Sequence, residues 1–300
     1  MRRIHCIGVV AAVVAGAVAL PSFTTAGAAR WGRTGHEIVG EVAATGLPAD
    51  MPSFFRNAAD QLSWLNYEPD RWRDRASTES NEAFQYDHFI DLEPIPDAAL
   101  AASHRFAYLE MQSKAGVARP EHLGLLPFRI LELTNRLTVG FRQWRAESDF
   151  RRRAWIEQRI INDAGILGHY IADGANPHHT TIHFNGWDAN TANPQNYTRD
   201  RTFHRRFESD FVNARIRAAD VQPHATAAPR ELTDLRAEVI AYIRRTHGLV
   251  RRLYDLEKQE SFGADTRAAG HREFAIERLA AGATMLRTIW FTAWRMSASD

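Results

Sequence analysis

Histidine and carboxylate side chains stand at helical spacing in the second half of the chain. His169 and Asp173 are four residues apart, so a helix would present both from one face. Pro177 ends this helix, and the chain then turns back through His178 and His179. Side chains of these types bind metal ions through nitrogen and oxygen. The segment therefore predicts several metal ligands at one helix end, with a helix cap followed by a surface turn as the alternative.

A second pair, His204 and Glu208, repeats the four-residue spacing farther along the chain. It lies one residue beyond a stripe of Phe203, Phe207 and Phe211, at the edge of a face predicted to be buried. A salt-bridged surface pair is the alternative, because two arginines stand beside these residues. Because the segment from His169 to His179 already offers several ligand-type residues, this second pair favours a metal site over a surface salt bridge.

The helix that carries His169 and Asp173 is predicted to be buried, because apolar residues cover most of its sides. A buried imidazole or carboxylate needs a partner. Zinc bound to histidine and aspartate satisfies both groups without any thiolate. The apolar residues of this helix include Ile160, Ile161, Ala164, Leu167 and Ile171.

The first third of the chain adds two segments with ligand-type residues. One reads Trp-Gly-Arg-Thr-Gly-His, and the other places an Asp and an Arg before a His-Phe-Ile-Asp string. A lone histidine at a helix start is usually a polar surface residue, and an ion pair between Arg73 and Asp91 is the alternative to substrate binding. The candidates here are Trp31, His36, Asp70, Arg73, His88 and Asp91.

The first thirty residues have the features of a secretory signal peptide. Arg2 and Arg3 precede an apolar run from Cys6 to Leu20, and small residues follow it. Cleavage would remove the single cysteine, which excludes a thiolate-bound metal in the mature protein. We therefore predict a signal peptide over residues 1–30, one domain over residues 31–300, and a secreted or periplasmic location.

The elements that must position these residues are predicted to be helices joined by Pro, Gly and Asn breaks. No segment shows sustained two-residue alternation, so we predict an all-α fold, a single multi-helix bundle with long metal-site loops. The two long loops are expected at Glu68–Pro96 and Thr180–Arg201. Helices are expected at Pro52–Leu65, Leu125–Trp144, Trp155–Asp173, Thr202–Ile216, Leu232–Phe262 and Arg267–Met296.

The overall charge does not point to a particular partner. The 300 residues carry a formal net charge of +1, which gives no global electrostatic case for a polyanion. No obligate protein partner is evident in the sequence, and we predict a monomer.

The four segments together resemble one superfamily, the zinc-dependent bacterial phospholipases C and the fungal and plant single-strand nucleases. They stand in the same order as in that superfamily, from Trp31 to Glu208. The most specific part is His169, Asp173, Asn176-Pro177 and His179, which is close to the His, Asp, Gln-Pro and His of the family. The N-terminal spacing is similar to the nuclease branch, and the Glu208 segment is similar to the phospholipase branch.

The resemblance implies three zinc ions. Asp173 would also bridge to the third zinc, which His36 and the backbone nitrogen and oxygen of Trp31 would complete. Arg30 departs from the family pattern, since the family has this tryptophan as the mature N-terminus. Asp74 is the fallback for Asp70, because the length of this loop varies. The first zinc would be held by Asp70, His88, His169 and Asp173, and the second by His179, His204 and Glu208.

The function that the resemblance implies is hydrolysis of phosphodiesters by a zinc-activated water. Arg73, steered by Asp91, is the candidate clamp for the phosphate oxygens, and Asp70 would orient or deprotonate the water. Single-stranded nucleic acid and phospholipid both stay open as substrates. An exported zinc-binding protein or a helical scaffold without catalysis is the alternative. Candidate aromatic platforms are Trp64, Trp72, Trp187 and Tyr197, and candidates beside the substrate are His178 and His183.

Overall fold

The computed structural model describes residues 32–74 and 76–298, and within these ranges the protein is all-α, as predicted. The only β-type pairings in this part of the chain are isolated bridges, Ile90 with Gly124 and Phe184 with Gly186. The predicted signal peptide and Trp31 lie outside the described residues. No helix in the described ranges is both long and apolar enough to traverse a bilayer.

The helices before the longest hairpin are mostly short. In chain order they are α1 (Arg33–Thr45), α2 (Ser53–Arg56), α3 (Ala59–Leu65), α4 (Glu68–Arg71), α5 (Thr78–Phe84), the 3-10 helix η1 (Gln85–His88), α6 (Asp97–Leu100), α7 (Arg105–Lys114) and η2 (Pro120–Leu123). The later ones are α8 (Leu126–Ala146), α9 (Phe150–Ala175), η3 (Pro177–Thr180), α10 (Phe203–Arg205), the π-helix η4 (Arg206–Phe211), α11 (Val212–Arg215), α12 (Ala218–Val221), η5 (Gln222–His224), α13 (Leu235–His247), α14 (Val250–Gln259) and α15 (Ala269–Met296).

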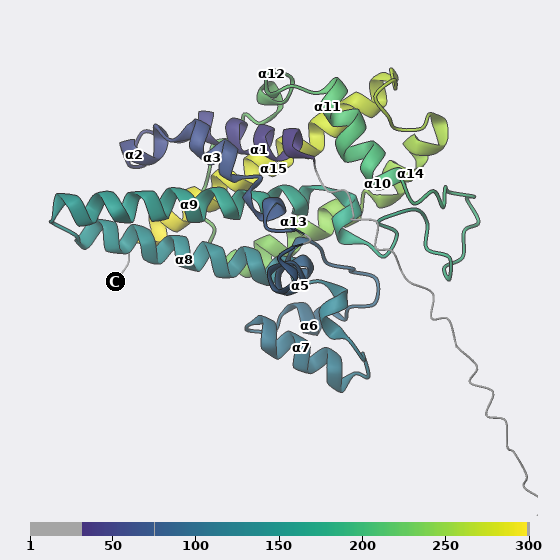
Figure 1. Cartoon of the computed structure of the whole chain (residues 1–300), viewed down its shortest axis with the longest axis horizontal. Coiled ribbons are helices and arrows are strands. Elements are labelled where there is room, and N and C mark those ends of the chain that lie inside the picture. Colours follow the sequence, from purple (N-terminus) through teal and green to yellow (C-terminus); the bar gives the residue numbers. More distant parts are fainter. Residues whose placement is uncertain (1–31, 75, 299–300) are drawn as a thin grey trace, which may run out of the picture.

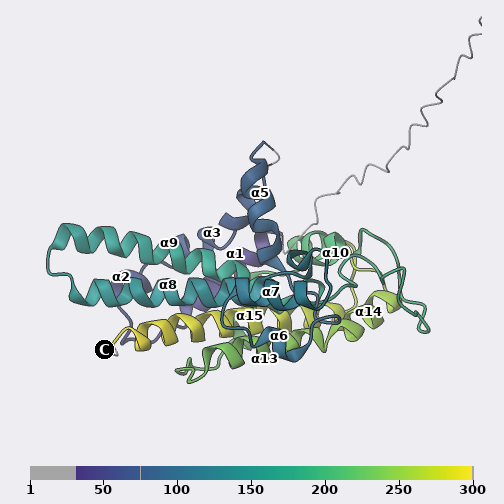
Figure 2. The same ribbon diagram turned by 90° about the horizontal axis from the view of Figure 1, so that it is seen from below.

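The long helices α8, α9 and α15 form the body of the bundle. Helices α8 and α9 run side by side as a hairpin in both views, and α1 and α15 pack along α9 (Figures 1 and 2). The buried Trp290 of α15 fixes one crossing, because its indole N–H donates to the Ala164 carbonyl at 3.1 Å. The C-terminal end of α9 is buried on every side, so polar residues there face protein rather than water.

A capping side chain marks the start of helix α9, and a proline follows its end. The Asp149 carboxylate caps its first turn by accepting from the N–H groups of Arg151 and Arg152, at 3.0 and 2.9 Å. Pro177 follows its end, and the Asn176 side chain accepts from the His178 N–H at 3.1 Å to start η3. The turn predicted after Asp173 is therefore a single 3-10 turn, and it keeps His178 and His179 beside the helix end.

Three expectations about the elements were wrong in detail. The stretch expected as a loop over Glu68–Pro96 contains α4, α5 and η1, and the helix expected over Pro52–Leu65 is broken between α2 and α3. The helix expected over Leu232–Phe262 divides at Gly248 into α13 and α14. Such short helices depend on caps and on neighbouring elements more than on apolar periodicity. The other four helices and the loop after Thr180 are present, with shifted ends.

Glycines on α9 allow α3 to approach closely. A Cβ atom on Gly165 would lie 2.3 Å from the Leu65 Cβ, and one on Gly168 would lie 2.1 Å from the Asn66 side-chain nitrogen. These distances are shorter than any real contact, so a side chain at either position would push α3 away. The approach places the Asn66 backbone against the end of α9, where the ligand-type residues lie.

We expect Gly165→Ala to lower the free energy of unfolding by about 1–3 kcal/mol, because overpacking outweighs the higher helix propensity of alanine. Thermal unfolding followed by circular dichroism measures this change. Gly270→Ala is the matched control, since its Cβ would make an ordinary 3.7 Å contact with Leu256. Equal melting temperatures for the two variants would contradict the close packing of α3 on α9.

Candidate metal centre

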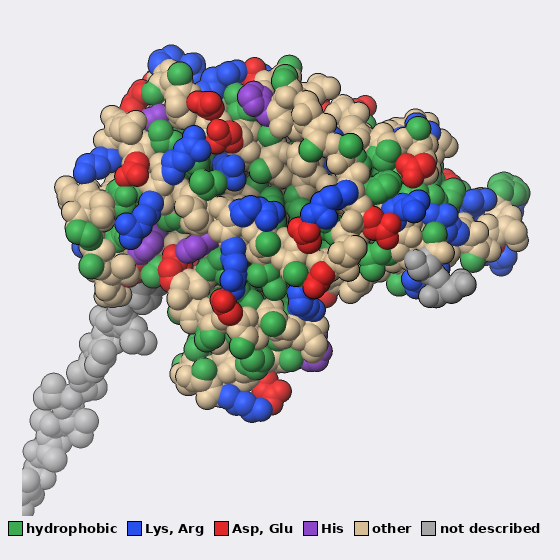
Figure 3. All heavy atoms as spheres, turned by 180° about the vertical axis from the view of Figure 1, so that it is seen from behind, with side chains coloured by type: hydrophobic (Ala, Val, Ile, Leu, Met, Phe, Trp, Pro, Cys, Tyr) green, Lys and Arg blue, Asp and Glu red, His purple; other side chains and the backbone are tan. Residues whose placement is uncertain are grey.

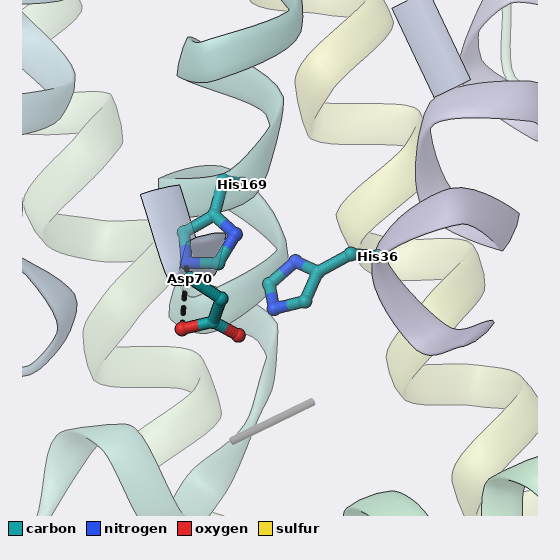
Figure 4. A group of neighbouring side chains, drawn as sticks. All are labelled: His36, Asp70 and His169. Atoms are coloured by element: carbon teal, nitrogen blue, oxygen red, sulfur yellow. Dashed lines mark ion pairs between the residues drawn. The ribbon is translucent and has the colours of Figure 1, made fainter. Parts of the chain in front are cut away.

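The structure brings eight of the nine predicted metal ligands into one buried network at the end of α9. The ninth, Trp31, lies outside the described residues. Figure 4 shows how α1, α4 and α9 bring His36, Asp70 and His169 face to face. The eight residues are His36, Asp70, His88, His169, Asp173, His179, His204 and Glu208.

Asp173 is at the middle of this network and contacts four histidines. Its Oδ2 lies 3.1 Å from His88 Nδ1 and 3.3 Å from His169 Nε2. Its Oδ1 lies 3.2 Å from His179 Nδ1 and 3.7 Å from His36 Nε2. The two oxygens therefore face different histidines.

One group of atoms has the spacing of a metal site. His169 Nε2, His88 Nδ1 and Asp173 Oδ2 are separated by 2.9, 3.1 and 3.3 Å, and all three residues are fully buried. Ligand atoms about 2.0–2.1 Å from a tetrahedral zinc are about 3.3 Å from one another. The three donors thus fit a single ion held by nitrogen and oxygen.

Backbone carbonyls fix the orientation of two histidine rings. His169 Nδ1–H donates to the Asn66 carbonyl, and His179 Nδ1–H donates to the His88 carbonyl, each at 2.8 Å. Such bonds set the tautomer and leave the Nε2 lone pair for an ion. Asn66 was missed by the sequence reasoning, because a residue that acts through its carbonyl carries no side-chain signal.

A second group comprises His179, His204 and Glu208. The Glu208 Oε2 lies 2.9 Å from His204 Nε2 and 3.6 Å from His179 Nε2, and it also accepts from the Asn176 side chain at 3.1 Å. The Glu208 Oε1 is buried and has no hydrogen bond among the described residues. The π-helical segment η4 carries Glu208, and such segments are frequent at functional sites. This group matches the set predicted for the second zinc.

A third group divides the ligands differently from the prediction. His36, Asp70 and His169 offer ligand atoms within 4.8 Å of one another, and the His36 and His169 rings stack at 3.9 Å. Because His169 Nδ1 is bonded to Asn66, its Nε2 alone serves both this group and the group with His88. Asp70 lies 3.9 Å from that nitrogen, and Figure 4 shows its carboxylate facing the His169 ring. The buried groups can hold metal ions. The number of ions depends on which of the two groups uses His169 Nε2 as a ligand.

Burial controls the protonation of these groups. Burial lowers the pKa of His36 well below its usual value, so its ring is neutral and its lone pair is free. Burial alone would raise the pKa of Asp173, but His179 and His169 hold it well below the usual value. Burial raises the pKa of Glu208 to about 8, with His179 opposing the rise. A bound cation would offset the cost of keeping both carboxylates ionised here.

The start of the described chain lies against the second group. The Gly32 N–H donates to the Glu208 carbonyl at 3.4 Å. A Cβ on Gly32 would come within 2.9 Å of the Ser209 hydroxyl, so the absence of a side chain allows this approach. The first described residue therefore lies beside the segment that carries Glu208.

The choice between Asp70 and Asp74 is decided by position. Asp74 is exposed, and its side chain accepts from the Ala76 N–H at 2.9 Å. Asp70 lies 3.8 Å from Arg73 Nη1 and 3.9 Å from His169. Asp70 is the carboxylate that the fold brings to the cluster.

The predicted pairing of Arg73 with Asp91 is replaced by a pairing with Asp70. The Asp91 backbone N–H donates to the Leu123 carbonyl, and its side chain neighbours Glu93 and Tyr108. Burial raises the pKa of Asp91 to about 8, and the charge of Glu93 adds to the rise. A carboxyl that is protonated at neutral pH cannot steer a guanidinium by charge.

We expect Asp91→Asn to be more stable than the wild type, by an amount that grows as pH rises from about 4 to 8. Across this range the unfolded wild-type chain loses the proton and the folded chain keeps it, which disfavours folding by up to about 1.4 kcal/mol per pH unit. Asparagine stays neutral in both states. Melting temperatures at pH 5 and pH 8 measure the effect, and a difference that does not grow with pH would contradict the burial of this carboxyl.

Two further histidines lie beside the cluster. The buried His178 stacks on His204 with ring centroids 4.6 Å apart, so it supports a ligand and is shielded from solvent. His183 stacks on Trp187 at 3.7 Å, and its Nδ1 accepts from the Asp188 N–H. Of the two, His178 supports the cluster directly, whereas His183 shapes the loop after Thr180.

The aromatic platforms predicted in that loop are internal. Trp187 and Tyr197 are buried and pack on Tyr254, with centroids 5.3 and 5.2 Å away. The prediction that they stack on a substrate was wrong, because the loop folds back and covers both rings. Trp64 is 48% exposed and has the Arg71 guanidinium 3.9 Å above its ring. It is the most accessible of the predicted platforms.

Comparisons with known proteins do not identify this chain. No family model, curated protein or solved structure matches it. The resemblance described above therefore rests on the motifs and the order in which they occur. The capacity to hold metal ions rests on the geometry of the buried histidines and carboxylates.

Proposed function

We propose that the protein is an exported zinc-dependent hydrolase that cleaves phosphodiester bonds, of the nuclease or phospholipase C type. The observation that carries this proposal is the position of Asp173, which contacts four buried histidines from three separate parts of the chain. Each buried imidazole needs its own polar partner. Here four rings share one carboxylate, and a bound metal ion would give each of them a partner.

The donor set fits zinc, since it contains imidazole and carboxylate and no thiolate. His88, His169 and Asp173 would hold one ion, and His179, His204 and Glu208 a second. His36 and Asp70 would complete the centre. When bound, zinc supplies Lewis acidity and a water of lowered pKa, which hydrolysis of a phosphodiester requires.

Arg73 is the residue that would bind the substrate phosphate. Its Nη1 lies 3.8 Å from the Asp70 carboxylate, and that carboxylate faces His169. An arginine at this place offers planar N–H donors to the non-bridging oxygens of a phosphate beside the ions. Asp70, rather than Asp91, would orient the guanidinium.

A metal-and-activity assay of His169→Ala tests the proposal. We expect this variant to lose bound zinc and turnover of bis-p-nitrophenyl phosphate, because its Nε2 serves two ligand groups. His271→Ala is the control, since His271 is equally buried but bonds to the Glu260 carbonyl outside the cluster. Activity retained in His169→Ala would reject the site.

Assays of the wild-type protein separate the function classes. Single-stranded DNA and phosphatidylcholine, tested side by side with zinc fully loaded, distinguish the two substrate classes. Bound zinc without turnover of any diester would indicate a zinc-binding protein, and the absence of bound zinc would indicate a helical scaffold. Either result would overturn the proposal.

A further inference from the structure

The tip of the α8–α9 hairpin exposes two large aromatic side chains. Phe150, the first residue of α9, is 76% exposed, and Trp155 is 70% exposed. At 100° per residue, both flank the outward face of α9, with Arg151 and Ala154 between them. These rings do not contribute to the hydrophobic core, because they point away from the bundle.

The same tip is basic. Residues 142–159 contain six arginines and three carboxylates, a net charge of +3 in a chain whose total is +1. The three carboxylates are engaged locally: Glu147 with Arg152, Asp149 in the helix cap, and Glu157 with the Trp144 indole. Arg142 and Arg151 are exposed and have no ion pair within the described residues. Figure 3 shows basic and hydrophobic side chains together at this end of the molecule.

A shallow groove of about 530 Å³ continues the apolar surface from Trp155 along the hairpin. The groove is open to solvent on one side, and both apolar and arginine side chains line it. The lining residues are Gln143, Ala146, Glu147, Arg152, Trp155, Ile156 and Arg159.

We propose that this tip docks on an anionic phospholipid surface. Phenylalanine and tryptophan enter the boundary between headgroups and acyl chains, and arginines keep their guanidinium groups among the phosphates. Negative lipids attract a basic segment at the surface. The charge also disfavours pairing of two copies through this tip, because each copy would bring the same net +3.

The docking surface is separate from the metal centre. Trp155 and His169 are fourteen positions apart along α9, which at 1.5 Å per residue is about 21 Å. Binding to vesicles therefore does not depend on the proposed hydrolase activity, and the two proposals can fail independently.

Sedimentation with vesicles tests the docking surface. We expect the purified protein to bind vesicles of phosphatidylcholine and phosphatidylglycerol at least about tenfold more tightly than vesicles of phosphatidylcholine alone. The double variant Phe150→Ala/Trp155→Ala is expected to lose this binding about tenfold or more, and Arg142→Gln/Arg151→Gln to weaken it and reduce its sensitivity to salt. Phe106→Ala is the control, because Phe106 is 72% exposed on α7.

Circular dichroism and melting temperature establish that each variant is folded. Equal binding of the wild type and the double aromatic variant would overturn the proposal, as would equal binding to neutral and anionic vesicles. Concentration-dependent dimerisation of the wild type that is lost in the double variant would also overturn it, and would assign the tip to a second copy of the chain.

Discussion

Asp173→Asn is expected to release most of the bound zinc and to lower phosphodiesterase activity at least about a thousandfold, which corresponds to about 4 kcal/mol of lost stabilisation. The reason is the number of groups that depend on this carboxylate. Its two oxygens lie between 3.1 and 3.7 Å from four histidine nitrogens. Asparagine keeps the shape but removes the negative charge and one ligand oxygen.

The control for this prediction is Asp163→Asn on the same helix. Asp163 is also buried, but it pairs with Arg136 at 2.9 Å and lies nearly three turns before Asp173. Metal content by mass spectrometry and turnover of bis-p-nitrophenyl phosphate measure both variants. Normal zinc content in Asp173→Asn would contradict the central place that we assign to this residue, whatever the activity.

Removal of metal by a chelator is expected to lower the melting temperature by about 10 °C or more. Ligand binding to the folded state contributes about 2.7 kcal/mol for each ion present at a hundred times its dissociation constant. For a protein of this size, 1 kcal/mol corresponds to about 2 °C or somewhat more. Without ions, the fully buried Asp173 and Glu208 carboxylates keep only neighbouring side chains as partners.

Differential scanning calorimetry with and without the chelator measures this shift, and addition of zinc should restore the original value. His169→Ala should respond less to the chelator than the wild type, because it has fewer ions to lose. An unchanged melting temperature for the wild type would favour a purely structural polar network. Such a result would also remove the basis for the proposed hydrolysis.

The sequence by itself determined the fold class and the local pairs. Apolar residues at helical spacing predicted the long helices, because this periodicity is a local property of the sequence. The four-residue spacing fixed His169 with Asp173, and His204 with Glu208, on common faces before any packing was known. Pro177 determined that His178 and His179 return to the helix end, since a proline stops α9 there.

Only the tertiary structure decided which ligands share an ion and which residues orient them. The Asn66 carbonyl meets His169 across 103 residues, and His88 meets Asp173 across 85, and no spacing rule reaches that far. The half-buried position of Asp91 and the burial of Trp187 likewise depend on how loops fold back on the bundle. Packing sets distances and dielectric surroundings, whereas sequence spacing sets only the direction in which a side chain leaves its own helix.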